Sequence, residues 1–153
     1  MGRIYEATKA WLATTGWRFM EHPERSYVAF PCQGRHALWQ CYAMANEERE
    51  RFVFHAVAAV RAPEAARLEV AEYITRVNYR VLLGNFYLDF SDGEIGYKTS
   101  FATDGVDDPT SLLAPTVFAN LHTADRFFPG LTAVMYGGST PQQAVELVLS
   151  ASC

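Results

Sequence analysis

Residues 63–101 switch from a helical to a strand-like pattern of apolar residues, and this switch constrains the fold more than any other feature. After Pro63, apolar side chains recur at three- and four-residue steps, which predicts a helix with one buried face that Gly84 closes. Residues 86–90 then alternate as in a strand, and Asp92-Gly93 predicts a tight turn into a second strand over 94–101. A helix followed by an antiparallel hairpin predicts an α+β fold. The recurring helix residues are Ala66, Val70, Tyr73, Ile74, Val77 and Val81.

The remaining segments supply the other parts of this fold. Residues 4–16 predict an opening helix, strand-like runs follow at 27–30, 36–46 and 52–60, and residues 17–20 are a lead-in or a further strand. After an acidic linker over 102–109, a helix is expected to start near Pro115 and to be interrupted or bent at 128–130. A capped helix that begins at Thr140-Pro141 follows. We therefore expect one domain over 1–153, an antiparallel sheet of about five strands with helices packed on it, in the order α-β-β-β-α-β-β-α(α).

Charge and composition argue against several classes of partner and location. The formal net charge is −4 and no run of Lys or Arg occurs, so we expect no nucleic-acid partner and no membrane surface. No apolar run reaches the ~18 residues of a membrane span, and the N-terminus lacks the apolar segment of a signal peptide. Cys32, Cys41 and Cys153 are too few for a secreted disulfide framework. A cytoplasmic protein with reduced thiols is the expectation.

The central strands are apolar on both faces, which is unusual for an antiparallel sheet with one wet side. Leu38, Tyr42 and Met44 share one face, whereas Trp39 and Cys41 lie on the other. Helices of one chain can cover one face, and a second copy of the chain is an equally good cover for the other. Because large exposed apolar patches are rare in monomers, we expect a homodimer.

Aromatic residues in these strands are the candidates for contact with another protein. Trp39, Tyr42, Phe52 and Phe54 are interface candidates because aromatic side chains dominate interface energetics, and the same residues are equally suited to the core. The expected function is therefore a non-catalytic protein-binding domain with a regulatory or chaperone-like role. The alternative is a small-molecule sensor with a pocket lined by Tyr73, Tyr79 and Tyr97, and an enzyme of unrecognised type ranks third.

The sequence offers no convincing catalytic, metal or cofactor site. With the hairpin tip at Gly34, Cys32 is expected opposite His36, so Cys41 would lie about five residues away along the strands, roughly 16 Å, which is too far for one zinc ion. No Gly-x-Ser-x-Gly elbow occurs, and His55 is expected to be a hydrogen-bonded residue in an apolar layer. Gly137-Gly138 before the last helix lacks the lysine of a phosphate-binding loop. We predict no enzyme activity, no metal and no cofactor.

Two stretches resemble the YbjN-domain family. Residues 78–101 match its core motif at Asn78, Gly84, Phe86, Leu88, Asp92, Gly93, Tyr97 and Thr99, and Tyr136-Gly137-Gly138 with Pro141 and Ala144 is similar to its C-terminal signature. The resemblance implies an α+β fold like that of type III secretion chaperones, which commonly dimerise, and a bacterial sensory transduction regulator without an assigned catalytic residue.

The motif residues themselves fit structural roles. Gly84 suits a helix cap and Gly93 a turn, because both positions need positive φ angles. Asn78 lies at the edge of the apolar helix face, where its amide would tie the helix to a neighbouring loop or strand, or contact a ligand or partner. Phe86, Asp92 and Tyr97 are expected to be structural as well.

Overall fold

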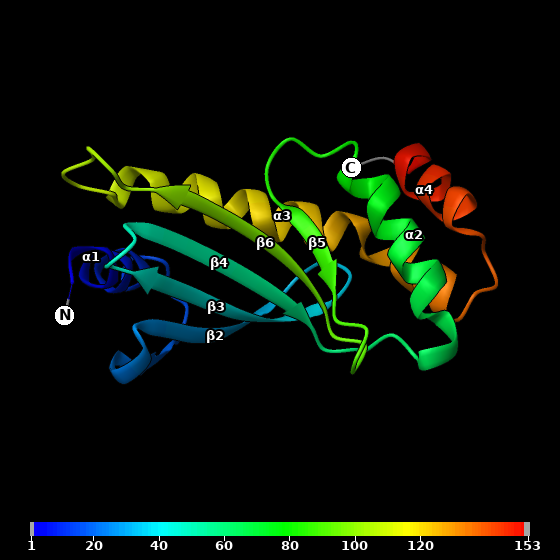
Figure 1. Ribbon diagram of the computed structural model, residues 1–153, viewed down its shortest axis with the longest axis horizontal. Helices are drawn as coiled ribbons and strands as arrows, with labels where there is room; N and C mark the ends of the chain where they lie inside the picture. Colours follow the sequence, from blue (N-terminus) through cyan, green and yellow to red (C-terminus); the bar gives the residue numbers. More distant parts are fainter. Residues whose placement is uncertain (1, 152–153) are drawn as a thin grey trace.

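The computed structural model describes residues 2–151, in which four α-helices and one six-stranded antiparallel sheet form an α+β fold (Figure 1). The elements are α1 (Arg3–Leu12), β1 (Met20–His22), β2 (Tyr27–Gln33), β3 (Leu38–Asn46), β4 (Arg51–Ala58), α2 (Arg67–Asn78), β5 (Asn85–Leu88), β6 (Ile95–Ala102), α3 (Thr110–Met135) and α4 (Pro141–Ser150). Short 3-10 turns, η1 (Pro23–Arg25) and η2 (Glu64–Ala66), precede β2 and α2.

The sheet has the strand order β1-β2-β3-β4-β6-β5, and all its pairs are antiparallel. Strands β1 to β4 follow one another as a meander, and α2 then carries the chain across so that β5 forms the far edge and β6 pairs with β4. The predicted fold class and the order of the main elements are confirmed. The sheet has one strand more than expected, because residues 20–22 pair with β2 as β1.

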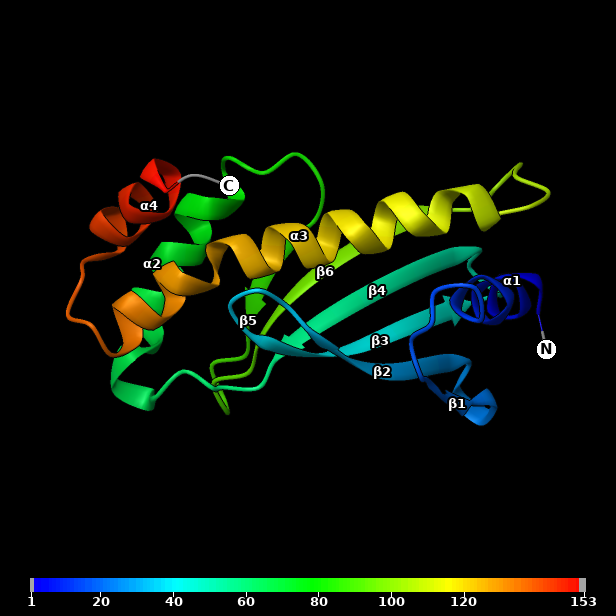
Figure 2. The ribbon, with the colours of Figure 1, turned by 180° about the vertical axis from the view of Figure 1, so that it is seen from behind.

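Helices cover one face of the sheet, the inner face, and none of the four within residues 2–151 covers the other face. Helix α3 crosses the inner face over β4 and β6, and α1 packs beside β3 (Figure 2). Alternate residues of the strands point to these helices and are buried, as their period of two requires. The inner-face residues are Val28, Phe30, Trp39, Cys41, Ala43, Ala45, Phe52, Phe54, Ala56, Ala58, Phe86, Tyr97 and Thr99.

A buried amide ties α3 to two strands of this sheet. The Asn120 side chain is fully buried, and its Nδ2 donates to the carbonyl oxygens of Phe54 (3.1 Å) and Tyr97 (3.0 Å). Carbonyl groups on β4 and β6 are thereby satisfied by a helix side chain instead of by water. This contact fixes the long helix across the strands.

Helix α2 ends earlier than its apolar period predicts, because Asn78 turns the chain. The Asn78 amide donates to the Phe86 carbonyl (3.1 Å) and accepts from the Phe86 N–H (2.8 Å), which confirms the predicted tie between helix and strand. The expected helix residue Val81 therefore lies in a loop, where Tyr79 and Leu82 are 92% and 98% exposed. Gly84 has the predicted positive φ of +77°, but it closes this loop and does not cap the helix, so the predicted cap is wrong.

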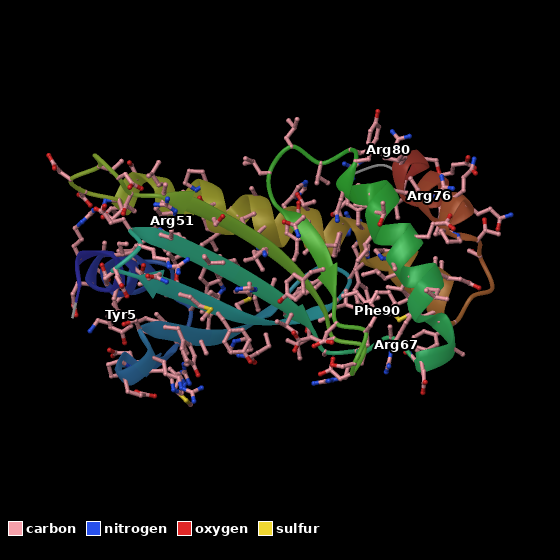
Figure 3. The ribbon with its side chains drawn as sticks, viewed as in Figure 1. Tyr5, Arg51, Arg67, Arg76, Arg80 and Phe90 are labelled. Carbon is pink, nitrogen blue, oxygen red and sulfur yellow. The ribbon has the colours of Figure 1, made fainter. Side chains whose placement is uncertain are left out.

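The hairpin of β5 and β6 forms as predicted and is attached to the start of α2. Gly93 has φ +81° in the turn, and Asp92 pairs with Arg61 at 2.6 Å. Arg67, at the start of α2, donates to the carbonyl of Phe90 at 3.0 Å, and the two residues lie close together in Figure 3. The motif residues Asp92 and Gly93 thus hold the turn in place.

The β2–β3 hairpin and α3 differ from the sequence-based prediction. Cys32 lies opposite Trp39, and Cys41 lies opposite Phe30, so the two thiols are two residues apart along the strands instead of five. The reason is that residues 34–37 form the loop, closed by a hydrogen bond from Gly34 N–H to the Ala37 carbonyl (2.7 Å). Helix α3 starts at Thr110 and continues through Pro115 and Pro129, so the expected start near Pro115 is wrong.

Candidate functional site

The outer face of the sheet is the part of the fold that no other element covers within residues 2–151. Its side chains alternate with the buried ones along each strand, and they are half-buried or exposed. We call this surface the open face. It consists of the outward side chains of Tyr27, Ala29, Leu38, Gln40, Tyr42, Met44, Val53, His55, Val57, Tyr87 and Lys98.

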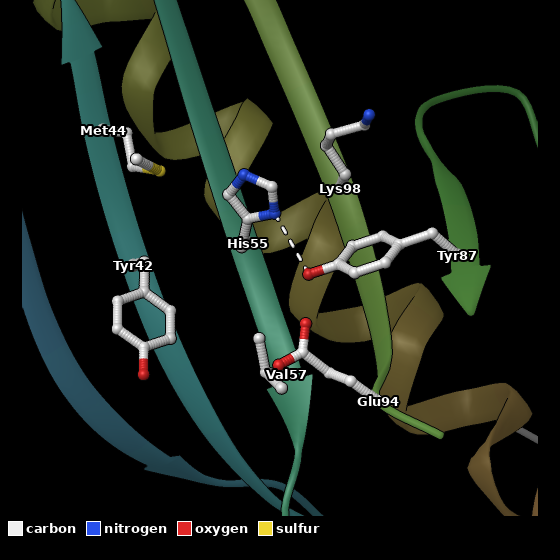
Figure 4. A pocket seen from close by; sticks show the side chains of 7 residues that line it. All are labelled: Tyr42, Met44, His55, Val57, Tyr87, Glu94 and Lys98. Atoms are coloured by element: carbon white, nitrogen blue, oxygen red, sulfur yellow. Dashed lines mark hydrogen bonds between the residues drawn. The ribbon is translucent and has the colours of Figure 1, made fainter. Parts of the chain in front are cut away.

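A shallow pocket of about 360 Å³ lies in the middle of the open face (Figure 4). The strand register brings its polar groups together, since Tyr42 pairs with His55 and His55 pairs with Lys98. Residues from four strands and the turn before β6 line it: Tyr42, Met44, His55, Val57, Tyr87, Glu94 and Lys98.

Gly96 allows Tyr87 to lie across the sheet. Tyr87 pairs with Gly96 in the register of β5 and β6, and a Cβ atom on Gly96 would overlap the Tyr87 ring. The ring therefore covers the glycine backbone and reaches His55 on β4, where its hydroxyl lies 3.1 Å from Nδ1. A glycine in a strand interior often marks such a close approach, and this is the sequence signal that could have identified Tyr87.

Burial keeps the His55 and Tyr87 pair neutral. Burial raises the pKa of Tyr87 to about 12, with smaller contributions from Glu94 and Tyr42. Burial also lowers the pKa of His55 below its ordinary 6.5, and the charge of Lys98 acts in the same direction. The phenol is then the hydrogen-bond donor and neutral Nδ1 the acceptor. His55 is thus hydrogen-bonded, as the sequence predicts. The Tyr87 phenol stays protonated, so it can make contacts but does not act as a nucleophile.

The four predicted interface residues fall on opposite faces. Three of them, Trp39, Phe52 and Phe54, are fully buried under the helices. They are core residues and are not available to a partner in this fold. Tyr42 is the one that lies half-buried on the open face. Trp39 and Tyr42 are three residues apart on one strand, and an odd spacing places them on opposite sides.

The predicted sensor pocket is wrong, because its three tyrosines do not come together. Tyr73 is buried and donates to the carbonyl of Phe127 (2.7 Å), and Tyr97 is buried with its hydroxyl bound to the carbonyl of Leu83. Tyr79 is exposed in the loop after α2. The two buried tyrosines therefore have structural roles, which is also the role expected for Tyr97 and Phe86 as motif residues.

Among residues 2–151, no group of three or more His, Cys, Asp or Glu side chains is arranged to hold a metal ion. Burial raises the pKa of the Cys32 and Cys41 thiols, which keeps both protonated and unreactive. Cys153 lies outside the described residues. None of the helices in the described part of the chain has the length and apolar character needed to cross a bilayer.

Comparisons with known proteins place this arrangement in one family. The YbjN family model, described as "Putative bacterial sensory transduction regulator", matches residues 6–133. A solved structure titled "Crystal structure of YbjN, a putative transcription regulator from E. coli" is similar with a TM-score of 0.61 and 14% identity, over 87% of this chain and 89% of that chain. At this identity the likeness concerns the fold. A search of curated proteins found no match.

Proposed function

The chain belongs to the YbjN family, and on this premise we propose that it is a non-catalytic regulatory domain that acts by protein association through the open face of its sheet. The observation that carries the proposal is that this face is uncovered and yet rich in aromatic and apolar side chains. Such a surface on a folded domain marks an interaction site.

The composition of the open face supports a protein partner. Tyr42, Met44, Val53 and Val57 lie on this face beside the polar side chains of His55 and Lys98. Protein interfaces are likewise enriched in aromatic residues and Met and include polar groups. The shallow shape also fits, because a flat sheet surface matches another protein better than it encloses a small ligand.

We commit to a second copy of the chain as the occupant of the open face. A two-fold interface must be self-complementary, so each charged group needs an opposite charge on the same surface. Lys98 and Glu94 both line the central pocket, and neither has an ion-pair partner among residues 2–151. In a face-to-face dimer, Lys98 of one copy would meet Glu94 of the other.

Association through one face would also explain a regulatory or chaperone-like role. A target protein that competes for the open face would exchange with the second copy, and the oligomeric state would then report the presence of the target. Residues on this face would contribute to both complexes, whereas residues on the covered face would contribute to folding alone.

The test is a pair of matched arginine substitutions, Val53→Arg in the centre of the open face and Leu82→Arg in the exposed loop after α2. Because Val53 would face the second copy and Leu82 is 98% exposed, we expect V53R to weaken dimerisation by at least about 100-fold and L82R to leave it unchanged. Light scattering behind size exclusion gives the masses, and circular dichroism confirms folding of both variants. Equal masses for wild type and V53R would refute the proposal, and so would an equal loss in L82R.

A further inference from the structure

A second and larger cavity, of about 810 Å³, lies away from the open face. It is bounded by the β2–β3 loop, the C-terminal half of α3 and the end of α4, and Figure 2 shows that loop beside the middle of α3. The function proposed above does not use this cavity. Its lining residues are Gly34, Arg35, His36, Leu121, His122, Asp125, Arg126, Pro129, Leu147, Val148 and Ala151.

Asp125 fixes the loop that forms one wall of this cavity. The Asp125 side chain is only 9% exposed, and its oxygens accept from the backbone N–H groups of His36 and Ala37, both at 3.1 Å, and from the Trp39 indole at 3.2 Å. A Cβ atom on Gly34 would overlap this carboxylate, so only glycine fits there. The loop is therefore held against α3 by charge-assisted hydrogen bonds, and the cavity is preformed.

The cavity is lined by more basic than acidic groups, although the whole chain has a net charge of −4. Arg35 and His36 come from the loop, and His122 and Arg126 come from α3. Within residues 2–151, none of these four side chains forms an ion pair. The one acidic group, Asp125, has its charge offset by three donors. An anionic ligand therefore has the cations of Arg35 and Arg126 available and no free carboxylate to oppose it.

The rest of the cavity lining is largely apolar. Leu121 and Pro129 on α3 face the cavity together with Leu147 and Val148 on α4. Leu147 is 53% exposed, which leaves apolar surface in contact with water. Burying that surface under a ligand would contribute to binding in proportion to the area covered.

We propose that this cavity binds a small amphipathic anion, a carboxylate with an apolar chain, with its head at Arg126 and the basic loop and its chain along Leu121, Pro129 and Leu147. The volume lies within the range of about 300–1,000 Å³ typical of small-molecule sites, and an apolar wall with a few convergent polar groups is their usual lining. The inference is independent of the dimer, because no residue of the open face lines this cavity. It would give the regulator a ligand to sense.

Calorimetric titration of the full chain with decanoate, below its micellar concentration, tests this proposal, with decan-1-ol as the uncharged probe of equal chain length. We expect decanoate to bind and decan-1-ol to bind at least about tenfold more weakly, because only the carboxylate meets the arginines. Arg126→Gln should weaken decanoate binding at least about tenfold and leave the decan-1-ol affinity unchanged. Leu147→Asp should weaken both probes.

Tyr42→Ala on the open face is the control, since it leaves the cavity intact, and we expect it to bind decanoate as the wild type does. Thermal unfolding of each variant confirms that it is folded. Absence of decanoate binding by the wild type, equal binding of the alcohol and the carboxylate, or an unchanged affinity in R126Q would each overturn the proposal. None of these results depends on the oligomeric state, so failure here is distinct from failure of the dimer.

Discussion

The two faces of the sheet are built from the same strands, and they differ in what lies above them. Trp39 and Phe54 on the inner face are completely buried beneath the helices, whereas Tyr42 and Met44 on the outer face are partly exposed, Met44 by 39%. Both faces carry aromatic and aliphatic residues. Apolar content alone therefore does not distinguish core from interface in this molecule, and the position of α3 decides the role of each residue.

The largest expected effect comes from truncating an aromatic residue on each face. Phe54→Ala should lower the free energy of unfolding by about 3–5 kcal/mol, because it leaves a cavity under α3. Tyr42→Ala should cost less than about 1 kcal/mol when measured at a concentration where the protein is monomeric. Urea unfolding of both variants gives these values. Similar losses for the two variants would contradict the contrast between the faces.

A smaller loss of stability is expected when the hydrogen bonds that join α3 to the inner face of the sheet are removed. Asn120→Ala leaves the carbonyls of Phe54 and Tyr97 without this donor, so the free energy of unfolding should fall by about 1–3 kcal/mol. Gln40→Ala is the matched control on the open face, where water replaces any lost contact. It should change the free energy of unfolding by less than about 0.5 kcal/mol. Chemical unfolding monitored by tryptophan fluorescence measures both. An Asn120→Ala protein as stable as wild type would show that the tie is dispensable.

The hydrogen bond on the open face should contribute less than the buried tie. Tyr87→Phe removes the hydroxyl that lies 3.1 Å from His55 and retains the ring over Gly96, so it should cost about 0.5–1.5 kcal/mol. Urea unfolding at neutral pH measures the change. Equal losses of stability for Tyr87→Phe and Asn120→Ala would contradict the prediction that the buried contact contributes more.

The smallest effect concerns pH, and its sign follows from the lowered pKa of His55. The unfolded chain has the ordinary pKa of 6.5 at this residue, so as the pH falls below that value the unfolded state takes up the proton first and the folded state loses stability. We expect the urea midpoint to fall between about pH 7.5 and about pH 5.5, and to fall less in His55→Gln. Parallel curves for the two proteins would mean that His55 does not titrate differently in the folded state.

The sequence predicted the architecture well where local signals are strong. The succession of helix and strand in residues 63–101, the turn at Asp92-Gly93 and the capping box of Thr140 with Gln143 appear in the structure as expected. These features depend on backbone preferences and neighbouring residues, so one sequence is enough to identify them. The position of Asn78 at the helix edge predicted a tie to a neighbouring loop or strand, and the structure shows that its partner is Phe86.

Long-range arrangements were harder to predict. Strand alternation separates Trp39 from Tyr42, but it does not say which of the two faces α3 covers. The basic cavity depends on Asp125, which reaches across 86 residues of sequence to the Trp39 indole, and no local pattern marks such a contact. The end of α2 was missed because the tertiary contact of Asn78 overrides a continuous apolar period. Residues brought together only by the fold thus make up most of both candidate sites.

Sedimentation equilibrium of the unmodified chain over nanomolar to high micromolar concentrations shows whether a second copy covers the open face in solution. We predict a mass that rises from that of one chain to that of two, with a dissociation constant that V53R raises and L82R does not. A mass of one chain at every concentration would contradict the claim that a second copy occupies the open face.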